Sequence, residues 1–354
     1  MKVGVLGVGG GTVGMTTYQR TLLEGLREMT THDVSFVAPS DDVSYTLPRS
    51  GPLRAFSNFV GRPDPRLRTA VRSADADVYI VNAAWPLPRE VNRWIAVVAE
   101  AVVNERAAWG VERSSHKRLA AKYLYRAVDG ASGIVAISEF TRDRLRDAFG
   151  LDHVAVAPPA LLSFDDEAAA TTYPPHVTVV GWFHPRKDLP LALHAWRAAM
   201  ARGLDRDLVL VGNEGPDDRR YGSVRRRIVE IAGAELASRV HHTGPLPRSE
   251  LGHVIRTGDA TLIASTYEGF GIPAIESFSF GRPVVAVDRG ALREVVAPHG
   301  TVTPPDADDI ADALVRVVQE PPDAAPLSAY AKTFDVARQV RPVIELLDGL
   351  RSPS

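Results

Sequence analysis

The sequence predicts an α/β protein built from two doubly wound parallel sheets. Short runs of β-branched and other apolar residues alternate with longer segments of helical periodicity, the pattern of parallel sheets covered by helices on both faces. These runs form two series, separated at residues 158–175 by a weakly periodic segment that contains an acidic cluster and a Pro-Pro pair. The length of 354 residues fits about two domains of ordinary size.

The first series begins at the N-terminus, where an apolar run passes directly into a glycine cluster. We interpret this run as a buried strand, because a signal peptide would continue into a longer apolar region and a small-residue cleavage site. The strands expected in the first series are Lys2–Leu6, Val34–Ala38, Val78–Asn82, Ala101–Asn104, Gly133–Ile137 and Val154–Ala157. Those expected in the second are Val177–Gly181, Leu208–Gly212, Val240–Thr243, Ala260–Ala264 and Pro283–Val287.

Amphipathic segments between these strands are expected to be helices, among them Tyr18–Met29, Lys117–Val128 and Arg142–Phe149. We expect one domain over residues 1–172 and a second over residues 173–335. The last periodic stretch follows a proline-rich connection, and we expect residues 336–354 to form a helix that crosses back to the first domain. With two such sheets, the expected ligand site is the cleft at the carboxyl ends of their strands.

The composition excludes several classes of protein. Apolar residues make up 45% and charged residues 24%, which argues against disorder and against a membrane bundle. Lys and Arg number 41 and Asp and Glu 43, so no overall charge favours nucleic acid as a partner. The chain has no cysteine, which excludes disulfides, thiolate nucleophiles and cysteine-bound zinc and fits a reducing compartment. No apolar run is long enough to span a membrane, and a cytoplasmic location is expected.

The first motif is the glycine loop after the first strand, Gly9-Gly10-Gly11-Thr12-Val13-Gly14. Glycines let the backbone approach a ligand closely, and the start of the following helix offers N–H groups to an anion. The spacing also fits a dinucleotide fingerprint, with Asp41 as a ribose acid, and a plain tight turn is the alternative. We expect contact with a phosphate or a sugar.

The second motif follows the first strand of the second series and carries two adjacent cations, Arg186 and Lys187. Pro185 ends any helix before them, so they lie on a loop or at a helix start. A planar arginine fork beside a lysine point charge suits a diphosphate, whereas a solvated surface pair is the alternative. Their place at the carboxyl end of a strand favours the diphosphate.

The third motif runs from Ser265 to Glu276 and is the most informative. A strand feeds a glycine-rich loop, and Pro273 is well placed as the first residue of a helix. Glu276 then falls in the first helical turn, where the helix dipole favours its anion, so no raised pKa is expected. Glu276 can accept hydrogen bonds from a ribose diol, and Glu268 can reach another part of the same ligand.

Weaker features each have a plain structural alternative. The pair Asn104-Glu105 closes an expected strand and could orient an acceptor hydroxyl. The turn Gly212–Gly215 could touch a base or phosphate, and Ser138-Glu139 could simply cap a helix. The pair His241-His242 lacks a third ligand at metal spacing and is interpreted as structural. The stretch Arg106–Arg126 holds six cations against one acid, and it is either a solvated helix face or a contact to an anionic acceptor or membrane surface.

These motifs together resemble the retaining glycosyltransferases of family four, which have the GT-B fold of two Rossmann-like domains facing across a cleft. The family string of Ser-x-x-Glu-Gly-Phe-Gly-x-Pro-x-x-Glu is matched by Ser265 through Glu276. The later Gly-x-Pro-Val-Val and Gly-x-x-Glu-x-Val segments are matched from Gly281 and Gly290. The Arg186-Lys187 loop and the loop from Gly9 to Tyr18 resemble the diphosphate and glycine loops of the family.

The resemblance implies a hexosyltransferase that uses a nucleotide-diphosphate sugar, based on UDP or GDP, in glycan or glycoconjugate biosynthesis. It implies that Arg186 and Lys187 bind the diphosphate and that Glu268 binds the transferred sugar, with no metal or other cofactor. Donor contacts are implied for Gly10, Gly11, Gly14, Gly181, Gly212, Phe270, Gly271, Ile272 and Glu276. The first domain would bind a glycan, lipid-linked or small-molecule acceptor, with Thr12, Asn104 and Glu105 on that side.

One position departs from the family, in which many members carry a histidine at the end of a first-domain strand where this chain has Asn104-Glu105. A nucleotide-sugar epimerase of the same architecture and an NAD-dependent oxidoreductase stay open as alternatives. The oxidoreductase explains the glycine loop but gives no role to Arg186, Lys187 and the two glutamates.

Overall fold

The computed structural model describes residues 1–7, 13–38, 65–83, 87–101, 115–164, 172–214 and 223–351, without the side chains of residues 13, 14 and 115–121. The described residues form two compact units, each with its own sheet. One unit comprises residues up to 160 together with residues from 334 onward, and the other comprises residues 161–333. The chain thus enters the second unit earlier than the expected boundary at residue 172. The reason is local, because the backbone carbonyls of Leu162 and Ser163 accept hydrogen bonds from Arg248 of the second unit.

The sheet of the first unit has six parallel strands in the order β2-β1-β3-β4-β5-β6. Their bounds are β1 (Lys2–Leu6), β2 (Asp33–Val37), β3 (Val78–Asn82), β4 (Trp94–Val98), β5 (Gly133–Ala136) and β6 (Ala155–Val156). The strand expected at Ala101–Asn104 lies outside the described residues except for Ala101, which is not in a strand. The fourth strand that the structure describes is β4, in the part of the same apolar run that precedes Glu100.

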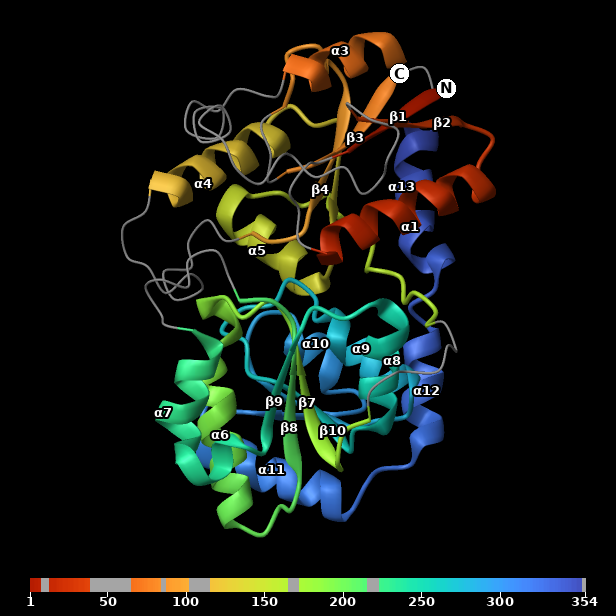
Figure 1. Cartoon of the computed structure of the whole chain (residues 1–354). Coiled ribbons are helices and arrows are strands. Elements are labelled where there is room, and N and C mark those ends of the chain that lie inside the picture. Colours follow the sequence, from red (N-terminus) through yellow and green to blue (C-terminus); the bar gives the residue numbers. More distant parts are fainter. Residues whose placement is uncertain are drawn as a thin grey trace. The chain divides into compact units, whose positions relative to one another are not determined.

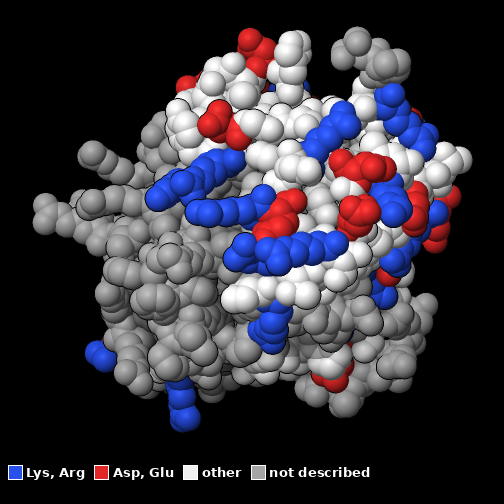
Figure 2. Space-filling model, turned by 90° about the horizontal axis from the view of Figure 1, so that it is seen from above, with Lys and Arg blue, Asp and Glu red and all other residues white. Residues whose placement is uncertain are grey.

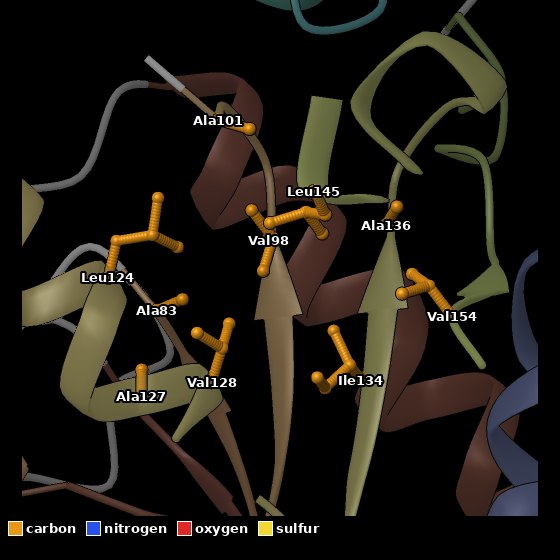
Figure 3. Close-up of a cluster of buried hydrophobic side chains, with 10 residues drawn as sticks. All are labelled: Ala83, Val98, Ala101, Leu124, Ala127, Val128, Ile134, Ala136, Leu145 and Val154. Atoms are coloured by element: carbon orange, nitrogen blue, oxygen red, sulfur yellow. The ribbon is translucent and has the colours of Figure 1, made fainter. Parts of the chain in front are cut away.

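Helices pack against this sheet (Figure 1). They are α1 (Val13–Met29), α3 (Pro65–Ala74), α4 (Ser115–Val128), α5 (Glu139–Phe149) and α13 (Val336–Gly349). One core cluster joins Leu124, Ala127 and Val128 of α4 to side chains of the neighbouring strands and of α5 (Figure 3). Close packing of such side chains excludes water and supplies most of the stability of a unit of this size.

The C-terminal helix α13 belongs to the first unit and lies beside α1 (Figure 1). The side chain of Gln339 is fully buried in this contact. Its amide nitrogen donates to Tyr18 O at 2.9 Å, and its oxygen accepts from Thr21 Oγ1 at 2.7 Å. Buried polar groups need such partners, so these bonds fix the register of α13 on α1.

The second sheet also has six parallel strands, in the order β12-β11-β10-β7-β8-β9. Their bounds are β7 (His176–Val180), β8 (Asp207–Val211), β9 (Val240–Gly244), β10 (Ala260–Ile263), β11 (Val284–Val287) and β12 (Thr301–Thr303). The chain runs outward from β7 to β9 and then returns to place β10 on the other side of β7. The strand order therefore reverses between β7 and β10, the place where doubly wound sheets bind ligands.

The helices of the second unit lie on both faces of its sheet, with α6, α7 and α11 on one side and α8, α9 and α12 on the other (Figure 1). Their bounds are α6 (Leu189–Ala201), α7 (Val224–Ala237), α8 (Arg248–Thr257), α9 (Ile272–Ser279), α10 (Leu292–Val296), α11 (Ala307–Gln319) and α12 (Ala324–Lys332). A short 3₁₀ turn, η1 (Pro185–Lys187), precedes α6. The prediction of two doubly wound parallel sheets is confirmed.

Charged side chains of both signs lie side by side on the described surface seen in Figure 2. Glu90, for example, pairs with both Arg68 and Arg72. Of the basic stretch Arg106–Arg126, side chains are described only from Lys122 onward, so its interpretation lies largely outside the described residues. No helix in the described ranges has the length and apolar content needed to cross a membrane.

Candidate active site

The second and third motifs meet at the carboxyl end of the second sheet. Arg186 and Lys187 lie in η1, directly after β7, whereas Ser265 to Glu268 follow β10, the neighbouring strand. The loops are joined by the backbone, since Thr266 N donates to Arg186 O at 2.8 Å and Thr266 Oγ1 to the same oxygen at 3.2 Å. The sheet order thus brings together residues that lie far apart in the sequence.

A buried ion pair forms the centre of this arrangement. Lys187 Nζ lies 2.6 Å from Glu268 Oε1, and the two side chains are only 15% and 10% exposed. Ser265 Oγ donates to the same carboxylate oxygen at 2.7 Å. Burial alone would raise the pKa of Glu268, but the charges of Lys187 and Arg186 and the two hydrogen bonds outweigh it. The pKa of Glu268 therefore lies below its usual value, and the residue is an anion at neutral pH.

Glu276 has a different environment from the one expected. It is the fifth residue of α9, which begins at Ile272, so it lies in the second turn and not in the first. Its side chain is 7% exposed, and Oε1 accepts from Arg248 Nη1 at 2.8 Å. Burial raises its pKa above the usual value even though Arg248 opposes the shift. The expectation that the helix start would hold this pKa down is wrong, because Glu276 lies beyond the reach of the first-turn N–H groups.

At two positions near these side chains, the backbone of a neighbouring loop comes so close that only glycine fits. A Cβ on Gly212, after β8, would lie 1.7 Å from Gly181 O, after β7. A Cβ on Gly290 would lie 2.3 Å from Glu268 O, and Ala291 N donates to that oxygen at 2.9 Å. No side chain fits at either position, so the backbones of neighbouring loops pack directly on one another.

The remaining donor residues of the second unit gather at the start of α9. Phe270 is buried, Gly271 is the N-cap residue, and Ile272 is the first residue of the helix. Pro273 is consequently the second helical residue, where its missing N–H costs no helix hydrogen bond. The N–H groups of a helix start favour a negatively charged ligand.

The expected residues of the first unit lie almost entirely outside the described residues. These are Gly10, Gly11, Thr12, Asp41, Asn104 and Glu105. Gly14 is described in its backbone only, as the second residue of α1. The interpretation that Asn104 and Glu105 close a strand of the first unit therefore stays a prediction.

The weaker features have structural partners. Ser138 caps α5, with its hydroxyl accepting from Thr141 N at 3.0 Å. His241 Nε2 lies 2.7 Å from Asp207 Oδ2, and His242 Nε2 lies 2.8 Å from Gly212 O. Within the described ranges, no three His, Asp or Glu side chains are grouped so that they could hold a metal ion.

Sequence reasoning did not identify Arg248, the partner of Glu276. It is the first residue of α8 and follows Pro247, which signals a helix start but does not say what the side chain faces. The contact depends on how α8 and α9 pack on the same face of the sheet, and no local pattern in the sequence encodes that packing.

The chain is similar to known glycosyltransferases. Residues 12–161 match the profile described as Glycosyltransferase Family 4, and residues 164–334 match that described as Glycosyl transferases group 1. The chain is 34% identical over 141 residues to the MMP α-(1→4)-mannosyltransferase of Mycolicibacterium hassiacum, covering 39% of this chain and 32% of that protein. Alignments with the first curated relatives span 32% to 59% of those relatives' lengths.

Solved structures share the fold over the whole chain. Sucrose-phosphate synthase from Thermosynechococcus elongatus superposes with a TM-score of 0.75 at 21% identity, covering 99% of both chains. Anabaena HepE in complex with UDP-glucose gives a TM-score of 0.70 at 16% identity, covering 99% of this chain and 100% of that one. With two family profiles matched in succession and this fold in both units, the chain belongs to glycosyltransferase family 4, in the group 1 class of GT-B proteins.

Proposed function

We propose that this chain is a retaining glycosyltransferase that moves a sugar from a nucleoside diphosphate to an acceptor hydroxyl without a metal ion. The observation that carries the proposal is the cluster at the reversal of strand order, where Lys187 pairs with the Glu268 carboxylate and the charge of Arg186 also favours its anion. A diphosphate leaves only when its negative charge is stabilised. Two cations and the N–H groups of a helix start can stabilise that charge.

Each residue then has a role that follows from its chemistry. Arg186 and Lys187 bind the diphosphate, and Glu268, held ionised by both, accepts hydrogen bonds from hydroxyls of the transferred sugar. Glu276 accepts from the ribose, and the backbone N–H groups of Phe270, Gly271 and Ile272 hold sugar or phosphate. Gly181 and Gly212 contact the donor through their backbone groups, at the place where the loops after β7 and β8 pack directly on one another.

The transfer itself needs no nucleophile from the protein in this proposal. The acceptor oxygen attacks the anomeric carbon on the face from which the phosphate leaves, and the leaving phosphate oxygen takes the acceptor proton. The bond from the anomeric carbon to the phosphate oxygen breaks while the bond to the acceptor oxygen forms, so the product keeps the anomeric configuration.

A glycosidase pair is the competing use of two glutamates. It needs one carboxyl with a raised pKa and one that is ionised, and Glu276 and Glu268 have pKa shifts of those two signs. Two observations argue against it. Arg248 donates to Glu276 and favours its charged form, and the relatives named above are transferases and a synthase.

Calorimetric titration with UDP, GDP, ADP, dTDP and NAD, with and without a chelator, tests the donor proposal. UDP and GDP are titrated first. HepE binds UDP-glucose in its solved structure, and one relative transfers mannose. We expect one nucleoside diphosphate to bind in preference and the chelator to have no effect. Binding of NAD alone would favour the oxidoreductase, and conversion of a sugar nucleotide without an acceptor would favour the epimerase.

The acceptor belongs to a separate test. With the preferred donor identified, sugar transfer to glycan, lipid-linked and small-molecule hydroxyls is measured by mass spectrometry, and the anomeric configuration by NMR. An inverted product would contradict the retaining proposal. Binding to anionic vesicles, compared with a charge-reversed Arg106–Arg126 variant, tests whether this stretch contacts a membrane.

A further inference from the structure

Arg248 connects the buried carboxylate of Glu276 to the first residues of the second unit. Its three guanidinium nitrogens each donate one hydrogen bond in a single plane. Nη1 donates to Glu276 Oε1 at 2.8 Å, Nη2 to Leu162 O at 2.5 Å and Nε to Ser163 O at 2.9 Å. The guanidinium also lies over the ring of Phe164, 3.9 Å from its centroid. An arginine held in this way has a fixed position and direction.

We propose that Arg248 is a positioning residue for Glu276, which it holds as an oriented acceptor for the vicinal diol of a ribose. This inference rests on the proposed function, because it takes the nucleotide ribose as the ligand of Glu276. It assigns a role to a residue that lies outside the three sequence motifs.

Arg248 orients the Glu276 carboxylate. A glutamate has three rotatable bonds, and it can accept from a diol only when a carboxylate oxygen with free acceptor positions faces the two hydroxyls. Within the described residues, Arg248 is the side chain that bonds the Glu276 carboxylate, through Oε1. Oε2 accepts no hydrogen bond from the described residues, and it is not among their fully buried unpaired atoms. Arg248 thus fixes one oxygen and leaves the other to a ligand.

Arg248 also favours the ionised form of Glu276. Glu276 is almost fully buried, and burial favours the protonated form of a carboxyl group. A protonated carboxyl loses one of its acceptor positions and becomes a donor. The guanidinium is the cation that opposes this protonation, so it keeps Oε2 an acceptor for hydroxyl groups.

Arg248 is itself held in place by an aromatic ring. Phe164, on which it stacks, packs on Phe280 with ring centroids 4.9 Å apart. A Cβ on Gly252 of α8 would lie 2.6 Å from Phe164 Cδ1, so the ring is seated directly on the helix backbone. The two carbonyls and this ring are already in place around Arg248, so orienting its side chain costs little entropy when a ligand binds.

The test compares Arg248→Met, Arg248→Lys and Glu276→Gln with wild type by calorimetry. The probes are UDP and GDP, their 2′,3′-dideoxy counterparts and inorganic pyrophosphate. We expect Arg248→Met to bind the preferred ribonucleotide about tenfold to hundredfold more weakly. The dideoxy nucleotide and pyrophosphate should bind as they do to wild type. Both Arg248→Met and Glu276→Gln should therefore lose discrimination between ribose and dideoxyribose.

The pH dependence adds a result that a merely structural role would not produce. Without the guanidinium the pKa of Glu276 rises further, so the affinity of Arg248→Met for the ribonucleotide should fall at weakly acidic pH and partly recover at alkaline pH. Glu276→Gln should show no such dependence. Arg248→Lys keeps the charge but not the planar fork, and should therefore keep the wild-type pH profile with intermediate discrimination.

The matched control is Arg256→Met, which removes a second arginine of α8 that lies over an aromatic ring of the same cluster, that of Phe280. It should leave every affinity unchanged. If Arg248→Met does not fold, Arg248→Lys decides the question by its discrimination ratio. An unchanged ratio in the Arg248 variants would overturn the inference alone, and tighter binding would show instead that Arg248 occupies the place of the ribose. If wild type binds no nucleoside diphosphate, the proposed function itself fails.

Discussion

The ammonium nitrogen of Lys187 lies 2.6 Å from Oε1 of Glu268, although 81 positions separate the two residues in the sequence. The contact exists because β7 and β10 are neighbours in the sheet, so the loops that follow them end at the same edge. The Arg-Lys motif and the first glutamate of the third motif are therefore parts of one electrostatic unit.

Removing the cation of this pair should destabilise the protein. In Lys187→Met, Glu268 keeps its charge at a position that is only 10% exposed. Leaving a buried charge unpaired costs about 3 kcal/mol or more. We expect the free energy of unfolding in urea to fall by about that amount at neutral pH. The double variant Lys187→Met, Glu268→Gln should regain part of it, and a double variant less stable than Lys187→Met would contradict the pairing.

Of the parts of the nucleotide, Arg186 should bind only the diphosphate. Arg186→Met is expected to weaken UDP or GDP binding about tenfold to hundredfold, since a charge-assisted contact to phosphate is lost. Binding of the matching nucleoside, which has no phosphate, should not change. Arg197→Met is the control, because Arg197 donates to Ile231 O on an exposed helix surface. Equal losses for nucleoside and diphosphate would refute the diphosphate role.

Much of this architecture could be predicted because its signals are local. Continuous apolar strands such as Val78–Asn82 mark the parallel sheets, and strongly periodic segments such as Val336–Gly349 mark helices. The rule that ligands bind at the carboxyl ends of strands then placed Arg186 and Glu268 at one edge of the sheet. The strand Thr301–Thr303 was missed because three residues carry too little periodicity to register.

The features that the sequence did not predict depend on tertiary packing. The strand Trp94–Val98 was missed, because its place in the sheet is set by pairing with the strands on either side. Glu276 was assigned to the first turn, as the fourth residue of a helix that began at Pro273, but the helix begins at Ile272 and Glu276 is its fifth residue. Its partner Arg248 comes from another helix, which no spacing rule connects to it.

The contact between Gly181 and Gly212 predicts a steric limit at the edge of the site. In Gly212→Ala the new methyl group would lie 1.7 Å from Gly181 O, so one of the two loops must move. We expect a loss of about 3 kcal/mol or more in stability and loss of nucleotide binding. Gly203→Ala is the control, because Gly203 also has a positive φ of 92° but nothing within 4 Å of a Cβ. It should cost only about 1 kcal/mol and leave binding intact. Equal losses in both variants would mean that backbone strain, and not the close approach, limits this position.

The two glutamates of the third motif should affect stability in opposite directions as pH changes. The folded pKa of Glu276 is raised above its usual 4.5 by burial, so between these values the folded state binds more protons than the unfolded state. The contribution of Glu276 to stability is therefore greatest at low pH and falls as pH rises through the folded pKa. Glu276→Gln removes this titration, while its amide oxygen can still accept from Arg248. Relative to wild type, the variant should become more stable as pH rises.

Glu268 supplies the internal control for that experiment. Burial raises its pKa, but Lys187 and Arg186 together lower it by more than burial raises it, so its folded pKa lies below 4.5. Between these values the unfolded state binds more protons, and the stability that Glu268 contributes is present at neutral pH and is lost as pH falls. Glu268→Gln should thus be less stable than wild type at neutral pH and approach it under acidic conditions. Urea unfolding of both variants and wild type across a series of pH values measures the two differences. If both differences changed with pH in the same direction, the two carboxylates would share one environment and could not have the separate roles proposed for them.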